Sequence, residues 1–210
     1  ALGLLLGLAP MALRNALVTG RPSIMPVHGG GTSFYIGNNP HARGGWNTAG
    51  ILSGEIEKER AEFAAALGIP YREPPPGSPA AAAASTQAAQ AIGAALYQRG
   101  LAYISDHPGA WLQLEARKLW ITVGNDEVLQ DYNLAGEHEQ VPFPLAYGLP
   151  FGVVLALGLV GLGALARDPR QRPLLLILLG QLAAVLAANL LFFTSSQHRL
   201  PLVIPLAFCA

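Results

Sequence analysis

Long apolar runs alternate with polar, turn-rich stretches in the second half of the chain. Residues 146–166 carry no charge, and residues 174–193 contain only Gln181 and Asn189 as polar side chains. A helix that crosses a bilayer needs about 20 predominantly apolar residues, so this pattern predicts two membrane spans. The apolar runs at residues 1–9 and 201–210 are too short to span. We expect each to be part of a truncated membrane helix, in a piece of a longer protein.

The charge between the two spans predicts the topology. Three arginines crowd the short loop at residues 167–173. Cytoplasmic loops carry an excess of Lys and Arg, so we predict that this loop is cytoplasmic. Alternation along the chain then places residues 10–145 and 194–200 on the outer face of the membrane.

Helical patterns recur in the predicted outer region. The expected helices cover residues 55–67, 85–106 and 108–123, with Gly68 closing the first, Ser85 as N-cap of the second and Pro108 at the first position of the third. Three consecutive prolines favour an extended connection over residues 69–84. The predicted fold is therefore mainly α: a polytopic integral membrane protein fragment with a mixed, mostly helical external subdomain.

The third predicted helix is apolar on most of its surface. Its expected apolar face comprises Leu112, Ala116, Leu119 and Val123, with Trp111 and Trp120 on the flanks. Tryptophans next to basic residues are typical of a membrane interface. We therefore predict that this helix lies along the membrane surface.

The stretch from residue 14 to residue 46 is rich in Gly, Pro and Asn, which favour turns and close backbone approach. We predict an ordered loop rather than a helix, with Thr32–Ile36 as one short strand. The stretch lacks the G-x-G-x-x-G and Walker patterns of nucleotide sites. His28–Gly31 looks like a lipase oxyanion motif, but the chain has no G-x-S-x-G elbow to supply its nucleophile. A purely structural cluster of turns is the alternative to a binding loop.

Composition narrows the class of protein. Of the 210 residues, 51% are hydrophobic and 12% are charged, against about 25% charged in soluble domains. This deficit favours a membrane protein. The net charge of zero provides no basic surface for nucleic acid, and the single cysteine, Cys209, excludes an internal disulfide. The five histidines show no metal-ligand spacing, so we assign no metal site and expect no cofactor, while the sequence leaves the metal dependence open.

Several segments resemble one family of membrane enzymes. These are Arg14-Asn15, VTGRPSIMPV at residues 18–27, GGGTSFYIGNNPHARGGW at 29–46, LAYISDHPGAWLQLEARKLW at 101–120 and HRLP at 198–201. In this order they resemble the GT-C type glycosyltransferases that use polyprenyl-phosphate sugars, such as the family 39, protein-mannosyltransferase-like and aminoarabinose-transferase-like members. The resemblance implies a multi-pass protein of the bacterial inner membrane. It would transfer a sugar from the lipid-linked donor to an acceptor lipid, glycan or protein.

The resemblance also suggests a site. We expect an outer-face cleft that binds the phosphate and sugar of the donor through Arg14, Gly30, Asn38, Asn39, Lys118, His198 and Arg199. Glu127 is a candidate supporting acid. In the family the principal catalytic acid lies in the first external loop, which we expect before residue 1, so this fragment alone should be inactive. The alternative is a non-catalytic polytopic membrane protein, a transporter or assembly subunit, whose external domain binds a partner.

Overall fold

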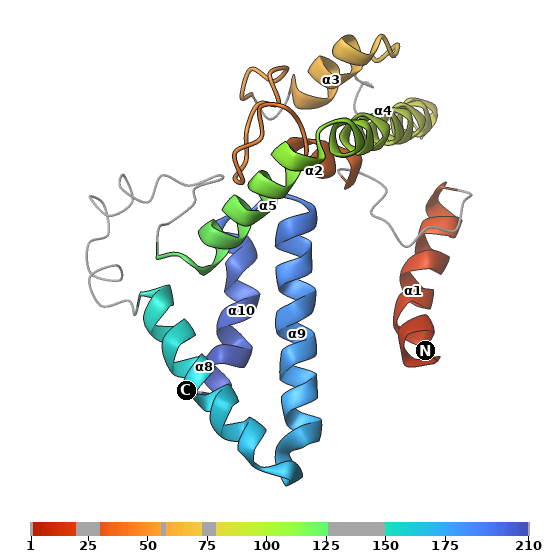
Figure 1. Cartoon of the computed structure of the whole chain (residues 1–210). Coiled ribbons are helices and arrows are strands. Elements are labelled where there is room, and N and C mark those ends of the chain that lie inside the picture. Colours follow the sequence, from red (N-terminus) through yellow and green to blue (C-terminus); the bar gives the residue numbers. More distant parts are fainter. Residues whose placement is uncertain (1, 20–29, 56–57, 73–78, 126–149, 210) are drawn as a thin grey trace, which may run out of the picture. The chain divides into compact units, whose positions relative to one another are not determined.

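The structure, a computed structural model, describes residues 2–19, 30–55, 58–72, 79–125 and 150–209 (Figure 1). Throughout these ranges the regular elements are helices and no strand occurs. In order they are α1 (Leu2–Thr19), α2 (Gly30–Gly37), α3 (Glu59–Leu67), α4 (Pro79–Asp106), α5 (Pro108–Val123), α8 (Phe151–Arg167), the 3-10 helix η2 (Pro169–Gln171), α9 (Arg172–Leu191) and α10 (Ser196–Cys209). The prediction of a mainly α chain is therefore confirmed.

The chain forms two compact units. The N-terminal unit comprises Ala1–His41 and Thr48–Asp106. The C-terminal unit comprises Ala42–Asn47 and His107–Ala210. The glycine-rich stretch is thus divided, since most of it belongs to the first unit and a six-residue segment belongs to the second.

Helix α1 corrects the predicted start of the glycine-rich loop. It continues through Pro10 to Thr19, so that Arg14 and Asn15 lie within a helix rather than after one. The residues from 11 to 17 (MALRNAL) are mostly strong helix formers. Their propensity outweighs the one hydrogen bond that Pro10 removes.

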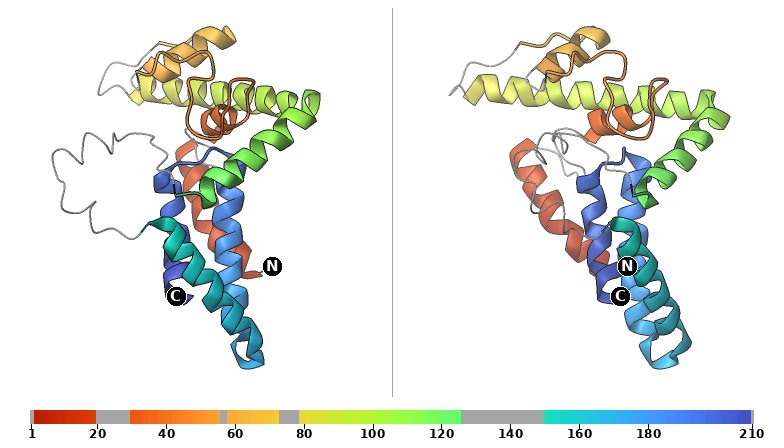
Figure 2. Two further views of the ribbon diagram at one scale, coloured as in Figure 1. Left: turned by 60° about the vertical axis from the view of Figure 1, so that its left-hand side comes forward. Right: turned by 90° about the vertical axis from the view of Figure 1, so that its left-hand side faces the viewer.

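Helix α2 corrects the predicted strand. Residues 32–36 carry the β-branched and aromatic side chains of a strand, yet all five lie in α2. The reason is tertiary packing, because α2 lies directly on α4 (Figure 2). A Cβ atom on Gly31 would overlap the carbonyl group of Gly93, and the ring of Phe34 stacks on that of Tyr97 at 4.9 Å. Such close packing overrides local strand propensity.

Helices α3 and α4 differ from prediction at their N-termini only. The first begins at Glu59 rather than residue 55, and Gly68 closes it as expected, with φ 67° and its N–H bonded to the carbonyl of Ala65 at 3.2 Å. The second begins at Pro79, so the prediction of Ser85 as its N-cap is wrong, as is the last part of the predicted extended connection. Five consecutive alanines precede Ser85, and alanine is the strongest helix former.

Helix α5 has the predicted bounds, Pro108–Val123, and the face opposite to its apolar stripe is buried. Its buried residues are Leu114, Lys118 and Thr122, spaced by four. The predicted apolar face is the exposed one, since Leu112 is 61% exposed and Trp120 is 74% exposed. The stripe that carries Lys118 and Thr122 therefore faces inward, and the more hydrophobic stripe faces outward.

Helices α8, α9 and α10 pack on one another in the C-terminal unit (Figures 1 and 2). Their shared core consists of Leu162, Leu178, Leu202 and Leu206. Glycines on α8 allow α10 to approach closely: a Cβ atom on Gly158 would lie 2.7 Å from Cδ2 of Leu206. Leucines on the far side, such as Leu176 at 69%, remain exposed.

One helix in the described ranges is long and apolar enough to cross a membrane. It is the 23-residue stretch Pro169–Leu191, which contains α9 and all but the last two residues of the predicted span at 174–193. Helix α8 has 17 residues, fewer than the about 20 that a span requires. The predicted span at 146–166 starts at residues outside the described ranges, so the polytopic arrangement stays a prediction.

Candidate functional site

The C-terminal unit contains a buried polar cluster centred on Lys118. This side chain is fully buried on the inner face of α5. Its Nζ atom donates to Oε1 of Glu115 at 2.7 Å and to the carbonyl oxygen of Leu190 at 2.6 Å. Burial lowers the pKa of Lys118, while its hydrogen bond and charge interaction with Glu115 oppose the shift. The lysine therefore links α5 to the C-terminal end of α9.

Two threonines extend the cluster. The Thr122 hydroxyl bonds to the carbonyl of Lys118 at 2.8 Å and lies 3.1 Å from the hydroxyl of Thr194. Both threonines are fully buried. Thr194 also donates its backbone N–H to the carbonyl of Gly44 at 2.8 Å. The cluster thus joins α5, the turn between α9 and α10, and the glycine-rich segment.

Gly44 has a conformation and surroundings that require glycine. Its φ of 99° is strained for any L side chain. A Cβ atom there would lie 2.8 Å from Cδ1 of Ile121 and 3.6 Å from Cγ of Lys118. The backbone of the Ala42–Asn47 segment therefore lies against α5.

Arg199 is the second buried cation of the unit, with 3% of its surface exposed. Its guanidinium donates to the carbonyl of Gly124 at 2.6 Å and more weakly to that of Ile121 at 3.5 Å. It also lies 5.0 Å from the ring centroid of Phe151, within the range of cation–π attraction. Arg199 therefore binds the carbonyls that α5 leaves unpaired at its C-terminal end.

His198 precedes Arg199 but points elsewhere. It is exposed, its Nδ1 lies 3.1 Å from the carbonyl of Phe193, and its ring lies 5.4 Å from that of Phe193. Nearby, Asn189 donates its amide to the carbonyls of Val185 and His198, and its buried Oδ1 has no hydrogen-bond partner. His198 thus lies on the same turn as Arg199 without sharing its contacts.

The asparagine pair expected to bind sugar hydroxyls has a structural role in the N-terminal unit. Asn38 donates its amide to the carbonyl of Phe34 at 2.9 Å. Asn39 donates to Tyr35 at 2.8 Å and to Ile36 at 2.9 Å, and its Oδ1 accepts the N–H of His41. Both side chains are buried. They bind the last carbonyls of α2, as C-terminal caps do.

The remaining predicted site residues belong to the N-terminal unit or lie outside the described residues. Gly30 begins α2, and Arg14 on α1 donates to Oδ1 of Asn15 at 3.2 Å. Both belong to the N-terminal unit, whereas Lys118, His198 and Arg199 belong to the C-terminal unit. Glu127 lies outside the described residues. Among the described residues, no group of three or more His, Cys, Asp or Glu could hold a metal ion.

Sequence reasoning missed several members of the buried cluster. Glu115, Thr122 and Thr194 were not predicted to take part. The signal for one of them, Thr122, was present, because Leu114, Lys118 and Thr122 follow a spacing of four along one helix. A stripe of Leu, Lys and Thr was overlooked beside the more hydrophobic stripe on the other side.

Comparisons with family models, with curated proteins and with solved structures gave no match to this chain.

Proposed function

We propose that this chain is part of a membrane glycosyltransferase. It would move a sugar from a polyprenyl-phosphate carrier to an acceptor at the outer face of the bacterial inner membrane. The observation that carries the proposal is the meeting of three segments distant in sequence: Ala42–Asn47, α5 and the turn before α10. The first two segments carry part of the resemblance to the transferases, and the turn leads into α10, whose first residues carry the HRLP part of it.

The chemistry of the donor calls for positive charge near the end of a membrane helix. A lipid-linked phosphate lies at headgroup depth, where Arg offers a planar fork and Lys a compact charge. Lys118 is anchored to the carbonyl of Leu190, in the last turn of α9, the helix with the length and composition of a span. Arg199 is anchored to the end of α5. In this proposal both charges are positioned before the donor arrives.

The acceptor hydroxyl needs a proton-accepting carboxylate. Glu115 belongs to the cluster, but its carboxylate forms an ion pair with Lys118 at 2.7 Å. The proposal therefore does not assign the principal acid to Glu115, and it keeps Glu127 as a supporting acid.

One observation favours the alternative, a non-catalytic polytopic membrane protein with a partner-binding external domain. Lys118 and Arg199 each bond to carbonyls near helix ends, and Asn38 and Asn39 do so on α2. A purely structural role would use the same contacts. An experiment must therefore separate folding from donor use.

The test uses the full-length protein in vesicles with polyprenyl-phosphate-linked hexose and pentose donors. Arg199→Lys keeps the charge but removes the fork, and Arg117→Gln is the control, because Arg117 is exposed on the same helix as Lys118. We expect Arg199→Lys to raise the KM for the donor roughly 10- to 100-fold, the range for a lost charged hydrogen bond, with kcat per folded enzyme little changed. Loss of turnover in proportion to loss of folded protein, or no transfer by the wild type from any donor, would favour the alternative.

A further inference from the structure

His198 is an exposed residue that buried neighbours hold in place. Its backbone N–H donates to Oγ of Ser195 at 3.2 Å, and its carbonyl oxygen accepts the side-chain amide of Asn189 at 3.1 Å. Its ring lies 5.4 Å from that of Phe193. Ser195, Asn189 and Phe193 are each at most 4% exposed. The position of this ring is therefore set by the core of the unit, although the ring itself is accessible.

A hydrogen bond also fixes which ring nitrogen carries the hydrogen atom. Nδ1 of His198 lies 3.1 Å from the carbonyl oxygen of Phe193. A carbonyl oxygen can only accept, so Nδ1 is the donor, and Nε2 of the neutral ring has the free lone pair. No residue within the described ranges forms a hydrogen bond with Nε2. The exposed side of the ring is thus a proton acceptor.

Bases in enzyme active sites share this arrangement. Histidine is the side chain that most often transfers protons in catalysis. Its other nitrogen is often held by a backbone carbonyl or a carboxylate, which fixes the tautomer, and a third group that orients the base is part of the same pattern. His198 has both features, because its Nδ1 is bonded and its Nε2 is free.

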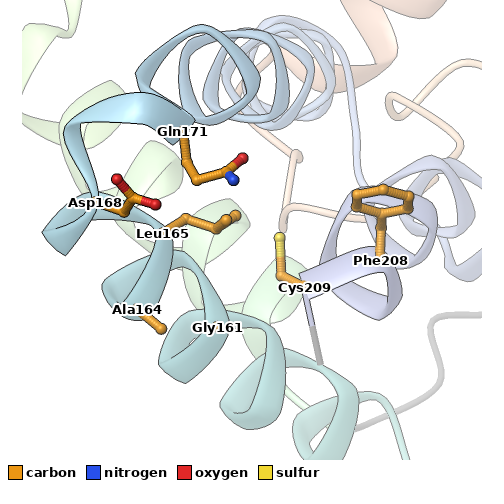
Figure 3. Close-up of a pocket in the computed structure, with 7 residues that line it drawn as sticks. All are labelled: Gly161, Ala164, Leu165, Asp168, Gln171, Phe208 and Cys209. Atoms are coloured by element: carbon orange, nitrogen blue, oxygen red, sulfur yellow. The ribbon is translucent and has the colours of Figure 1, made fainter.

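The other imidazole and carboxylate groups in the described part of the C-terminal unit are engaged or distant. The carboxylate of Glu115 is paired with Lys118. A groove of about 410 Å³ beside α8 and α10 has one carboxylate in its lining, Asp168 (Figure 3), and this group accepts a backbone N–H as the cap of η2. His107 lies at the other end of α5 from the carbonyls that Arg199 binds. His198, which directly precedes Arg199, is the remaining candidate.

We propose that Nε2 of His198 takes the proton from the acceptor hydroxyl. The inference rests on the proposed glycosyltransferase function, and it gives an imidazole the role of the carboxylate that this function leaves unassigned. In the step, the acceptor oxygen forms a bond to the anomeric carbon of the sugar while its proton moves to Nε2. The bond from that carbon to the phosphate oxygen breaks, and its electron pair stays on the phosphate. The exposed imidazolium then returns the proton to water.

The positions of His198 and Arg199 suit these two roles. They are consecutive residues of α10, and neighbouring residues of an α-helix project about 100° apart. Arg199 bonds to the end of α5, whereas the ring of His198 stays outside these contacts. A sugar at this turn can therefore have its phosphate toward Arg199 and its acceptor toward Nε2.

The test compares two kinds of acceptor with the full-length protein in vesicles. A hydroxyl acceptor, supplied by a membrane extract, must lose a proton, whereas azide attacks without losing one. His198→Asn keeps an amide N–H near the place of Nδ1 and removes Nε2. We expect it to lower kcat with hydroxyl acceptors roughly 100- to 10,000-fold, the range for proton transfer by a positioned side chain. The KM for the polyprenyl-phosphate donor and the rate of glycosyl azide formation should be unchanged. Gln197→Asn, at an exposed neighbour on the same turn, is the control and should behave as the wild type does.

Equal turnover of hydroxyl acceptors by His198→Asn and the wild type would overturn the inference and leave the proposed function intact. A loss of azide transfer as large as the loss of hydroxyl transfer would also overturn it, because His198 would then act on folding or on the donor. A wild type that transfers sugar to neither acceptor from any donor would contradict the proposed function, and the inference with it.

Discussion

The Nζ atom of Lys118 lies 2.6 Å from the carbonyl oxygen of Leu190, although the two residues are 72 positions apart in sequence. This bond connects a buried charge on α5 with the C-terminal end of α9, where the carbonyls carry the negative end of the helix dipole. A helix end that would otherwise have an unpaired carbonyl is thus bonded by a cation from another element.

Removing this cation should destabilise the C-terminal unit. Lys118→Met keeps most of the volume but leaves the Leu190 carbonyl and the Glu115 carboxylate without their shared donor. We expect a loss of about 3–5 kcal/mol in unfolding free energy, as for other broken buried pairs, measured by urea unfolding in detergent. Arg117→Met, on an exposed neighbour, should lose less than about 0.5 kcal/mol. Equal effects in the two variants would mean that the cation is dispensable.

The buried lysine also predicts a pH dependence. Burial lowers the pKa of Lys118 below its usual value of 10.5. Between the lowered and the usual value, the folded state binds fewer protons than the unfolded state, so stability rises with pH across that window and is lowest below it. We therefore expect the wild type to gain stability relative to Lys118→Met as the pH approaches 10.5. Urea midpoints of both proteins over a pH series test this, and a gap that narrows with rising pH would contradict it.

Gly44 provides a test of the contact between the glycine-rich segment and α5. Gly44→Ala introduces a Cβ atom 2.8 Å from Cδ1 of Ile121 at a φ of 99°. Gly54 is a matched control, because its φ is 97° and nothing lies within 4 Å of its added Cβ. Gly54→Ala should cost about 1–2 kcal/mol for the left-handed backbone alone, and Gly44→Ala should cost about 1–3 kcal/mol more for the overlap. Adding Ile121→Val, which removes Cδ1, should restore part of that difference, and a double variant as unstable as Gly44→Ala would argue against this contact.

The exposed apolar face of α5 predicts contact with lipid. Trp120 is 74% exposed and Leu119 is 41% exposed on this face, and tryptophan concentrates at membrane interfaces. With Trp46 and Trp111 replaced by Phe, the fluorescence of Trp120 in vesicles should be quenched by lipids brominated near the carbonyl region and protected from iodide. Strong quenching by iodide together with no effect of bromine would show that α5 lies away from the membrane.

Local signals predicted some elements well. The bounds of α5 followed from Pro108, which suits a first helical turn, and Gly68 was correctly expected to close α3. Helix α9 followed from an uncharged apolar run. These features depend on residues that are neighbours in sequence, so a sequence pattern alone can predict them.

Tertiary contacts decided what the patterns missed. Residues 32–36 read as a strand, but the approach of Gly31 to Gly93 and the caps from Asn38 and Asn39 favour a helix. The apolar face of α5 was recognised, but the inward stripe of Leu114, Lys118 and Thr122 was not, because only hydrophobic positions were followed along this helix. Lys118 and Arg199 were selected for their charge, whereas their carbonyl partners could be found only in three dimensions.

The central claim, that a lipid-linked phosphate docks at the cluster of Lys118 and Arg199, can be tested most directly by photo-cross-linking. A polyprenyl-phosphate sugar with a photoreactive group next to the phosphate would be activated on the full-length protein in vesicles, and the labelled peptides identified by mass spectrometry. We predict labels within residues 108–124 and 192–199, suppressed by unlabelled polyprenyl phosphate and reduced in Arg199→Lys. Competable labels that fall only in other parts of the protein, with both segments unlabelled, would contradict the account.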